Sequence, residues 1–460
     1  MENTEEFALG LDIGTTKVCA VLGKVVVRNN HHRLEILAFG ESNYGEAKSV
    51  EKGVVKNVNA VAKAIKNAMD EVTPAIEAYF DDHNMPQFAV NLNVAGQHIG
   101  RLNKPEILVR RASTDEVVND TDMEELRIKL YQINVAAGCE IIHVLPIDFS
   151  LDDECGIINP IGRMGARLEG NFQIITAQTR ALKEIQASVT LSNSNLVKGS
   201  VVLSPLASAL SVLEDEEMKS GVVLVDIGGG TTDIVVYEND IMRHVAVLSL
   251  AGAHITHDIS TAFGLNERQA ELLKVKFGNA TPWTWPEDTF VRIKSASPQR
   301  PAKEVMLKNV ALVIQARLRE IAAQVNEELE RSGYKKRLID GIVITGGSAV
   351  IPGIETVFKE VIGVDYVRIG HPQWLEVGKN AEIANKTSYA TALGLVWSGF
   401  KMLDRRIGKT DSEMMELLKG KIATIKVVKK DPEPSKTDFF SKVKGFFNDD
   451  LGGTDSRYGS

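Results

Sequence analysis

Two stretches decide the fold: Asp12-Ile13-Gly14-Thr15-Thr16-Lys17 near the N-terminus and Asp226-Ile227-Gly228-Gly229-Gly230-Thr231-Thr232-Asp233 near the middle. Both open with Asp-Ile-Gly and continue with small residues. An apolar run precedes each stretch, at 7–11 and 222–225, and another follows it, at 18–22 and 234–237. The pattern of strand, Gly/Thr turn and strand therefore occurs twice, and each copy is predicted to form a β-hairpin.

The composition of these turns suits phosphate binding. Glycine lets the backbone turn tightly and approach a ligand closely, and successive N–H groups in such turns form a concave site for anions. Threonine hydroxyls add donors, and an aspartate at the end of a strand can hold a metal ion through water. Two ordinary Gly-rich hairpins are the alternative. The near-duplication favours a pair that clamps the β- and γ-phosphates of a nucleotide from both sides.

The whole chain has the composition of an ordinary globular protein, with 44% hydrophobic and 25% charged residues. Its 460 residues exceed the size of a single core, so more than one domain is expected. The net charge of −8 gives no indication of nucleic-acid binding. Three cysteines without CxxC spacing favour reduced thiols and a cytoplasmic setting. The sequence has no apolar run of about 18 residues and no signal-peptide pattern.

Apolar periodicity predicts the remaining elements of the first half. Strands are expected at 7–11, 18–27, 34–39 and 88–95, and helices at 58–72 and 180–191. The pattern changes between these, where strands at 107–109, 140–146 and 172–176 flank a polar helix at 115–137 and a turn at 159–162. This middle stretch is predicted to be an inserted subdomain.

The second half repeats the order of hairpin followed by helices. Helices are predicted at 205–213, 265–277 with Asn266 as N-cap, 303–332 and 389–402; strands are predicted across 222–250 and at 338–345; a loop with a short strand is predicted at 281–300. The sequence His254-Ile255-Thr256-His257-Asp258 favours surface or capping roles over a metal site. Duplication of this kind implies two similar α/β domains around a ligand cleft.

Five motifs in this order resemble the actin, Hsp70 and sugar-kinase superfamily. The two hairpins resemble its two phosphate loops, and Ile344-Thr345-Gly346-Gly347-Ser348-Ala349 resembles its adenosine turn. Pro205–Leu213 and Ala390–Leu395 resemble its two connecting helices. The resemblance implies an α/β, actin-like (ribonuclease H-like) two-domain fold with a nucleotide cleft.

Within that superfamily the chain resembles the bacterial FtsA cell-division family. Four stretches carry this narrower resemblance: Ile141–Pro146 with Gly156–Leu168, Pro205–Ser208, Ala270–Lys274 followed by Gly278, and a terminal amphipathic segment. The family implies subdomain 1A at 1–87 and 178–199, an inserted subdomain 1C at 88–177, subdomain 2A at 200–255 and 335–383, subdomain 2B at 256–334, a helix returning to 1A at 384–403, a flexible linker at 404–434 and an amphipathic membrane-targeting helix at 435–451.

The superfamily resemblance also implies roles for the site residues, with ATP and Mg²⁺ as cofactors. Asp12 would hold Mg²⁺ through water, and Asp226 would face the metal or the attacking water. The residues expected to contact phosphate are Gly14, Thr15, Thr16 and Lys17 in one hairpin and Gly228, Gly229, Gly230 and Thr231 in the other. Gly346 and Gly347 would lie against the adenosine.

Three further site residues follow from the family. Glu271 and Lys274 lie three apart on one predicted helix, so both are expected to reach the ribose; a surface i,i+3 ion pair is the alternative. Ser204 stands where polymerising relatives often have Gln or Glu to orient the attacking water. Because serine is a short side chain and a poor base, the expectation is ATP binding with slow or undetectable hydrolysis.

The C-terminal segment is the second most informative stretch. Its aromatic and aliphatic residues fall on one helical face, at Phe439, Phe440, Val443, Phe446 and Phe447, and Lys442 and Lys444 lie on the polar side. A helix of this length suits the membrane interface and is too short to span a bilayer. Docking onto the globular body or into a protein groove are the alternatives. Single-copy membrane binding is expected to be weak, and polymerisation would strengthen it through avidity.

These features lead to a functional hypothesis. The family implies an ATP-binding scaffold that polymerises at the cytoplasmic face of the membrane, at the division site, and anchors filaments of the tubulin-like protein FtsZ, with FtsZ docking on 256–334. The alternatives are a pilus-assembly-type scaffold and a small-molecule kinase of the same superfamily. The amphipathic terminal segment favours a scaffold over a kinase.

Overall fold

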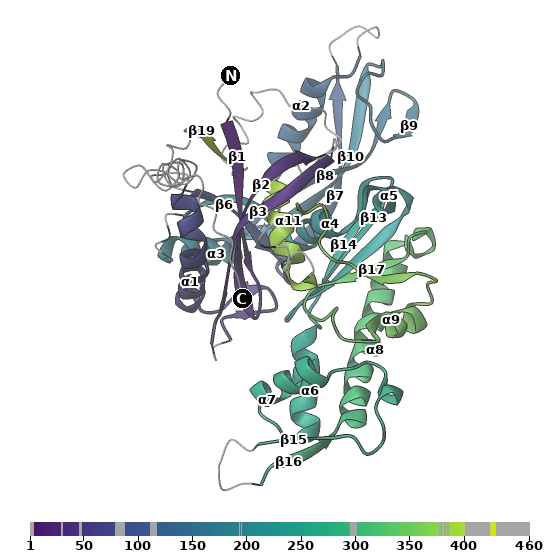
Figure 1. The fold of residues 1–460 in the computed structure, drawn as a ribbon. Coiled ribbons are helices and arrows are strands. Elements are labelled where there is room, and N and C mark those ends of the chain that lie inside the picture. The colour runs from purple at the N-terminus through teal and green to yellow at the C-terminus, as the bar shows by residue number, and fades with distance from the viewer. Residues whose placement is uncertain are drawn as a thin grey trace, which may run out of the picture. The chain divides into compact units, whose positions relative to one another are not determined.

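A computed structural model describes residues 4–28, 31–45, 48–78, 88–110, 117–192, 194, 196–294, 301–376, 380, 383, 386–400 and 424–428 (Figure 1). The chain divides into two compact units, Glu6–Ile425 and a second one composed of Met1–Glu5 and Lys426–Ser460. Both hairpins and the helices around them lie in the first unit. The amphipathic segment at 435–451 lies outside the described residues, and Thr424–Val428 forms strand β19 within the stretch predicted as a linker.

The first half is built on a sheet with strand order β11-β6-β1-β2-β3. Its strands are β1 (Thr4–Ile13), β2 (Lys17–Arg28), β3 (His31–Asn43), β6 (Phe88–Val94) and β11 (Leu196–Leu203). The β1–β2 and β2–β3 pairs are antiparallel, whereas β6 pairs in parallel with both β1 and β11. The small pair β4 (Val50–Glu51) and β5 (Val54–Val55) follows β3 in the chain.

The second half repeats this sheet. Its strand order is β14-β13-β12-β17-β18, with bounds β12 (Val222–Ile227), β13 (Thr232–Glu238), β14 (Ile241–Leu248), β17 (Ile342–Thr345) and β18 (Val367–Ile369). Again the central strand is antiparallel to the next strand in the chain and parallel to the strand on its other side. Every residue of β12 is buried. The predicted duplication and the actin-like fold class are therefore confirmed.

Helices fix the sheets relative to each other. Helix α1 (Val58–Glu77) begins at Asn57, whose side chain accepts the Ala60 N–H, and it buries one apolar face. Helix α3 is Thr179–Leu191. The connecting helices α4 (Ser204–Val212) and α11 (Ala390–Phe400), the latter after η3 (Thr387–Tyr389), cross with direct backbone contact. A Cβ at Gly394 would lie 1.7 Å from the Ala207 carbonyl oxygen, so only glycine allows this crossing.

Each half carries its own insertion. In the first half, β7 (Ile99–Val109), β10 (Arg167–Gln178), β8 (Cys139–Leu151) and β9 (Glu154–Ile157) form a separate sheet in that order, covered by α2 (Asp120–Tyr131). Phe149 and Phe172 meet edge-to-face in its core. Because β6 at Phe88–Val94 belongs to the sheet of the first half, we call residues 96–178 the inserted subdomain from here on.

The second half instead inserts a helical region (Figure 1). Its elements are α6 (Gly252–Phe263), α7 (Glu267–Phe277), η1 (Pro282–Thr284), the hairpin β15 (Phe290–Ile293) and β16 (Lys303–Met306), α8 (Leu307–Ser332) and η2 (Lys335–Arg337). Helices α5 (Asp215–Ser220) and α9 (Ile354–Ile362) complete the half. Helix α8 buries the apolar face that its periodicity predicted, with Val310, Ile314 and Leu318 in the core.

Several element bounds differ from the sequence predictions. The predicted helix at 303–332 begins only at Leu307, because Lys303–Met306 pairs with β15 as a strand. The helix predicted at 115–137 is limited to Asp120–Tyr131, where an Asn119 capping box starts it. The strand predicted at 338–345 begins at Ile342. Helices α5, α6 and α9 were missed. Within the described residues, no helix is long and apolar enough to cross a membrane.

Candidate functional site

The two hairpins have the same register. Ile13 pairs with Val18 in the first and Ile227 pairs with Thr232 in the second, so each turn contains four residues. The Gly14 N–H donates to the Lys17 carbonyl at 3.0 Å, and the Gly228 N–H donates to the Thr231 carbonyl at the same distance. Gly229-Gly230 therefore occupies the positions of Thr15-Thr16, although the sequences suggest matching the Thr-Thr pairs.

The tips of the two hairpins face each other. A Cβ built on Gly229 would lie 2.9 Å from Cγ2 of Thr16, and one built on Gly230 would lie 2.5 Å from Oγ1 of Thr15. Neither glycine has a positive φ, so a lack of space, and not backbone conformation, explains why glycine stands there. The threonines of one hairpin thus fill the room that the glycines of the other leave.

Both tips present amides that nothing else uses. The N–H groups of Thr15, Thr16, Gly229 and Gly230 donate no hydrogen bond within the described part of the chain. In the second hairpin the carbonyls are occupied, since Gly228 and Gly229 accept from the Gly252 and Ala253 N–H groups at 3.0 and 2.8 Å. Four unused amides on two facing turns form the kind of concave donor site that binds a phosphate group.

The base of the first hairpin is held by side chains that the sequence did not reveal. Asn93 on β6 accepts the Ile13 N–H through Oδ1 at 2.8 Å, and its Nδ2 donates to Ser204 Oγ at 3.3 Å. The Tyr44 hydroxyl donates to the Gly14 carbonyl at 2.8 Å. Lys17 forms an ion pair with Glu41 at 2.7 Å and lies 3.8 Å from the centre of the Tyr389 ring. The structure therefore places Lys17 against its own half of the protein.

Three carboxyl groups converge beneath the tips. Burial raises the pKa of Asp12 to about 7; Lys17 opposes this rise and the nearby Asp226 adds to it. Burial also raises the pKa of Asp226, against hydrogen bonds donated by Ser208 at 2.6 Å and Thr391 at 3.3 Å. Asp233, opposite Asp226 in the hairpin, has a pKa raised by burial and then by Asp226. Such a cluster favours a bound cation, which would let the carboxyl groups ionise.

Gly346 and Gly347 follow directly after β17. Gly346 has φ of +92°, and a Cβ there would lie 2.3 Å from Asp226 Oδ1, so this turn packs onto the base of the second hairpin. Thr387 Oγ1 donates to the Gly346 carbonyl at 2.7 Å. A Cβ on Gly347 would meet only the Ser388 Cβ at 4.0 Å. The predicted adenosine turn therefore lies beside the second hairpin, with one tight and one open glycine.

Glu271 and Lys274 form the i,i+3 ion pair that was the alternative prediction, at 2.7 Å. Lys274 also donates to the Gly252 carbonyl at 3.1 Å and to Thr256 Oγ1 at 2.8 Å, and Thr256 donates to Glu271. Because the Gly252 N–H holds the Gly228 carbonyl, this network links α7 to the second hairpin. The pair is thus next to the candidate site as well as being an ion pair.

Ser204 and His254 have structural partners. Ser204 is buried, and its hydroxyl donates to the Val94 carbonyl at 3.2 Å while it accepts from Asn93. His254 Nδ1 accepts the Ala251 N–H at 3.2 Å at the start of α6, in agreement with the predicted capping role. Among the described residues, no group of three or more His, Cys, Asp or Glu side chains is arranged to hold a metal ion by itself, so an ion near the three carboxyl groups would also need water or phosphate ligands.

The residues at the hairpins fit a metal–nucleotide complex. The buried Asp233 Oδ1 has no hydrogen-bond partner among the described residues, the Asp12 side chain makes no hydrogen bond there, and four amide donors face one another. Sequence reasoning found the turns, but missed Tyr44, Asn93, Ser208 and Thr391. Only Ser208 and Thr391 gave a signal, because they lie on the two predicted connecting helices.

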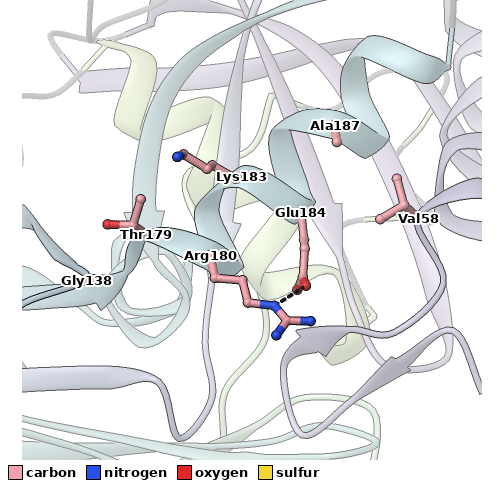
Figure 2. A pocket seen from close by; sticks show the side chains of 7 residues that line it. All are labelled: Val58, Gly138, Thr179, Arg180, Lys183, Glu184 and Ala187. Atoms are coloured by element: carbon pink, nitrogen blue, oxygen red, sulfur yellow. Dashed lines mark hydrogen bonds and ion pairs between the residues drawn. The ribbon is translucent and has the colours of Figure 1, made fainter.

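A cavity of about 470 Å³ lies elsewhere, beside the start of α3 (Figure 2). Its lining consists of Val58, Gly138, Thr179, Arg180, Lys183, Glu184 and Ala187. The Arg180–Glu184 ion pair at 2.9 Å crosses it. None of the residues predicted for the nucleotide site lines this cavity.

The repeated sheets, the crossing helices and the facing hairpins together define a protein of the actin-like fold. A solved structure described as the PilM-PilN type IV pilus biogenesis complex has this fold, with a TM-score of 0.59, 18% identity, and coverage of 86% of this chain and 98% of that one.

The sequence comparisons narrow the class to one family. Residues 223–394 match the family described as Cell division protein FtsA, and residues 96–176 match the SHS2 domain inserted in FtsA. Cell division protein FtsA of Pseudomonas aeruginosa is 31% identical over 393 residues, which cover 85% of this chain and 89% of that protein. The Escherichia coli K12 protein of the same name is 32% identical over 401 residues, covering 86% and 90%. The chain belongs to the FtsA family of cell-division proteins.

Proposed function

We propose that this chain is an ATP-binding actin-like scaffold in cell division that binds Mg²⁺-ATP between its two hairpins. The observation that carries the proposal is the pair of facing turns with four unused amides above a cluster of buried carboxyl groups. Membership of the FtsA family supplies the cellular setting.

The proposed roles follow from the positions of the groups. The amides of Thr15, Thr16, Gly229 and Gly230 bind phosphate oxygens, with Gly14, Gly228 and Thr231 completing the turns. Asp12 would hold Mg²⁺ through water, and Asp226 would face the ion or the attacking water; the ion would supply positive charge that neutralises the phosphates. Lys17 adds a point charge while Glu41 and Tyr389 support its side chain. Gly346 and Gly347 lie against the adenosine, and Glu271 with Lys274 faces the ribose.

Hydrolysis at this site is proposed to be slow. Ser204 and Asn93 hydrogen bond to each other and to backbone groups, so neither is placed to activate a water molecule. A positioned base or water-orienting group is what hydrolysis needs in such sites. The measurement is the steady-state release of phosphate; a rate above about 1 s⁻¹, the lower end of common enzyme turnover numbers, would contradict the proposal.

The membrane part of the proposal rests on the sequence of residues 435–451, which lie outside the described residues. The apolar face formed by Phe439, Phe440, Val443, Phe446 and Phe447 enters the membrane interface, and Lys442 and Lys444 remain in the headgroup region. The chain polymerises on the cytoplasmic face of the membrane at the division site, and many weak anchors then act together. Replacing Phe439 and Phe446 by Asp is expected to abolish pelleting with liposomes.

FtsZ is the proposed filament partner, docking on residues 256–334. Support comes from family membership and from the exposed apolar side chains of this region, which include Leu272, Val275, Trp283, Phe290 and Leu312. Trp283 is 68% exposed, and exposed large aromatics are typical of binding sites. Replacing Trp283 and Phe290 by Ser is expected to weaken co-sedimentation with FtsZ polymers. Ile339→Ser is the control, because Ile339 is an even more exposed apolar residue outside the region.

The first test is co-sedimentation with liposomes, with and without ATP, for the full chain and for a chain that ends at Asp431. Pelleting that needs both the terminal segment and ATP supports the proposal. A parallel titration with a fluorescent ATP analogue tests the nucleotide site separately from the membrane scaffold. Analogue binding without pelleting would contradict the membrane scaffold alone, and absence of analogue binding would contradict the nucleotide site.

A further inference from the structure

The inserted subdomain is joined to the first half by a narrow neck. The chain enters it between β6 and β7 and leaves it where β10 passes directly into α3. The two crossings lie side by side, because the Gln178 N–H donates to the His98 carbonyl at 3.2 Å. Gly96, with φ of +117°, lies in the entering segment between β6 and β7. The cavity shown in Figure 2 borders the leaving segment at Thr179, whose N–H donates to the Gly138 carbonyl at 2.8 Å. A subdomain on two adjacent crossings needs further contacts to fix its orientation.

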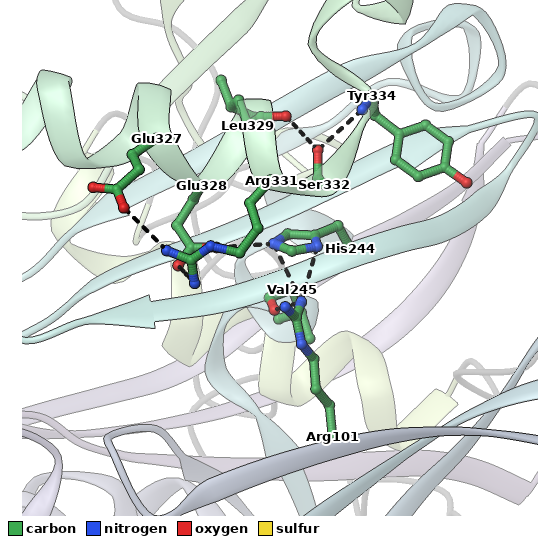
Figure 3. Close-up of polar contacts among 9 residues, drawn as sticks. All are labelled: Arg101, His244, Val245, Glu327, Glu328, Leu329, Arg331, Ser332 and Tyr334. Atoms are coloured by element: carbon green, nitrogen blue, oxygen red, sulfur yellow. Dashed lines mark hydrogen bonds and ion pairs between the residues drawn. The ribbon is translucent and has the colours of Figure 1, made fainter.

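Those contacts are made with the other half of the protein. Arg101 on β7 reaches across to β14, where its Nη1 donates to the Val245 carbonyl at 2.8 Å and lies 2.8 Å from His244 Nδ1 (Figure 3). His244 Nε2 lies 3.3 Å from Glu328 Oε2 on α8. Glu328 is also paired with Arg331 at 2.9 Å. His244 and Glu328 are buried, with exposed fractions of 6% and 8%.

The contacts favour one tautomer of the histidine. Arg101 Nη1 lies closer to Nδ1 of His244, at 2.8 Å, than to Nε2, at 3.2 Å, and Nε2 also faces Glu328. Arginine has only donors, so the tautomer that satisfies all three side chains has Nδ1 accepting from Arg101 and the Nε2 proton donated to the Glu328 carboxylate. His244 is therefore a neutral relay between the guanidinium of Arg101 and the carboxylate of Glu328. Each of these three side chains provides a hydrogen-bond partner for the next, so the loss of one of them is costly in a buried setting.

We propose that Arg101, His244 and Glu328 form a clasp that holds the inserted subdomain against the second half, and that opening the clasp frees this subdomain to turn about its neck. The clasp joins an element of the first half to a sheet and a helix of the second. It ties the two halves together in addition to the facing hairpins and the crossing of α4 and α11. The inserted subdomain then follows the second half when the two halves move relative to each other.

Another link between the inserted subdomain and the second half is weaker, because Arg243 Nη1 donates to the Ile147 carbonyl at 3.2 Å. A different bond joins the subdomain to β11 of the first half, where His143 on β8 accepts the Leu203 N–H at 3.0 Å. The first is a single bond between an arginine and a carbonyl. The second lies next to the neck and can act as part of the pivot. Removal of Arg101 should therefore be enough to release the subdomain.

The test is a pulsed-EPR distance measurement between the inserted subdomain and the second half. Spin labels are attached at Thr121→Cys on α2 and Lys359→Cys on α9, both exposed positions, in the full chain with Cys139→Ser and Cys155→Ser. The parent is expected to give one narrow distance distribution. Arg101→Ala is expected to give a broad or two-peaked distribution. Arg163→Ala is the matched control, since it removes an exposed ion pair with Glu154 inside the same subdomain.

A second pair of variants keeps the test decisive if Arg101→Ala does not fold. His244→Gln retains one acceptor and one donor and is expected to keep the narrow distribution, whereas His244→Leu is expected to broaden it. Hydrogen exchange of β14 in the unlabelled protein should become about tenfold faster in Arg101→Ala than in Arg163→Ala, the scale of a charged hydrogen bond. A parent-like distribution in both Arg101→Ala and His244→Leu, or equal exchange of β14 in the two arginine variants, would overturn the proposal.

Discussion

The two hairpins have the same backbone and different side chains, and the difference assigns them different tasks. Both turns contain four residues and close with the same glycine-to-carbonyl hydrogen bond. The first hairpin places Thr15 and Thr16 at its tip, while the second places Gly229 and Gly230 there, directly opposite. Two identical tips would either collide or leave a gap. The duplicated unit has therefore become complementary to itself, which brings both sets of amides to one place.

The two hairpins also differ in the buried side chains around their aspartates. Asp12 and Asp226 hold equivalent positions, but Ser208 and Thr391 donate only to Asp226. The residue opposite Asp12 is Cys19, and the residue opposite Asp226 is Asp233. The second hairpin thus carries more negative charge and more hydroxyl support. The first is the simpler of the two, and its aspartate depends more directly on a bound cation.

Making the tips identical should have the largest effect. The double variant Gly229→Thr/Gly230→Thr gives the second hairpin the threonine pair of the first, and both new side chains would collide with Thr15 and Thr16. Overpacking of this kind costs about 1–3 kcal/mol at each position. We expect a loss of stability of about 2–6 kcal/mol in urea unfolding and loss of ATP-analogue binding.

The reciprocal change is the control for this prediction. Adding Thr15→Gly and Thr16→Gly to the double variant restores the space, so most of the lost stability should return. A quadruple variant as unstable as the double variant would show that the tips do not need to be complementary.

Replacing each aspartate by asparagine should change the stability of the protein by a different amount in the two hairpins. Burial raises the folded-state pKa of Asp12 from 3.8 to about 7, so the stability of the protein decreases as the pH rises through this window. Asp12→Asn should therefore stabilise the cation-free protein above pH 7, by at most about 4 kcal/mol, and the gain should shrink as the pH falls toward 4. Asp226→Asn should gain less, because Ser208 and Thr391 already stabilise the carboxylate.

Urea unfolding at pH 8 and pH 5 without Mg²⁺ measures this difference. Both variants should lose Mg²⁺-dependent ATP binding despite their stability. Equal gains for the two variants at pH 8 would contradict the difference drawn between the two aspartates.

A buried histidine in the insertion of the first half should make the protein sensitive to acid. Burial lowers the pKa of His143 to about 4, and its Nε2 accepts the Leu203 N–H. Because this pKa lies below the unfolded value near 6.5, the stability contribution is complete above pH 6.5 and is lost as the pH falls toward 4. Between pH 6.5 and 5 the loss should be about 2 kcal/mol.

His143→Gln keeps an acceptor for Leu203 but cannot titrate, so its stability should depend less steeply on pH in this window. Unfolding midpoints measured at several pH values compare it with the parent. Parallel curves for the two proteins would count against a role of His143 in the acid sensitivity.

The smallest effect is expected at the last position of each turn, where the first hairpin has Lys17 and the second has Thr231. Lys17→Met removes the ion pair with Glu41 and the contact with the Tyr389 ring, which together contribute about 1 kcal/mol. Because salt screens the ion pair, the loss of stability on unfolding should be smaller in about 0.5 M salt than in about 0.05 M salt. Thr231→Val, the matched variant, should show no such dependence on salt.

Local signals predicted a large part of this protein. Turn chemistry identified both hairpins, apolar periodicity identified α1, α3, α4 and α7, and Asn266 was recognised as the cap of α7. Helix α6 was missed because its N-terminus carries no side-chain cap of the usual kind, and His254 takes that place. The sequence prediction included β16 in α8, because β16 forms by pairing with β15 and this pairing leaves no local signal in the sequence.

The sequence by itself determined the duplicated sheet units, the two Gly/Thr turns and the family, because strand patterning, glycine placement and helix periodicity are properties of residues close together in the chain. Only the tertiary structure decided which residues complete the site and which hold the subdomains together. Asn93 meets Ile13 across 80 positions and Arg101 meets His244 across 143. Such pairs form because folding places distant strands side by side, and their burial then makes each hydrogen bond matter.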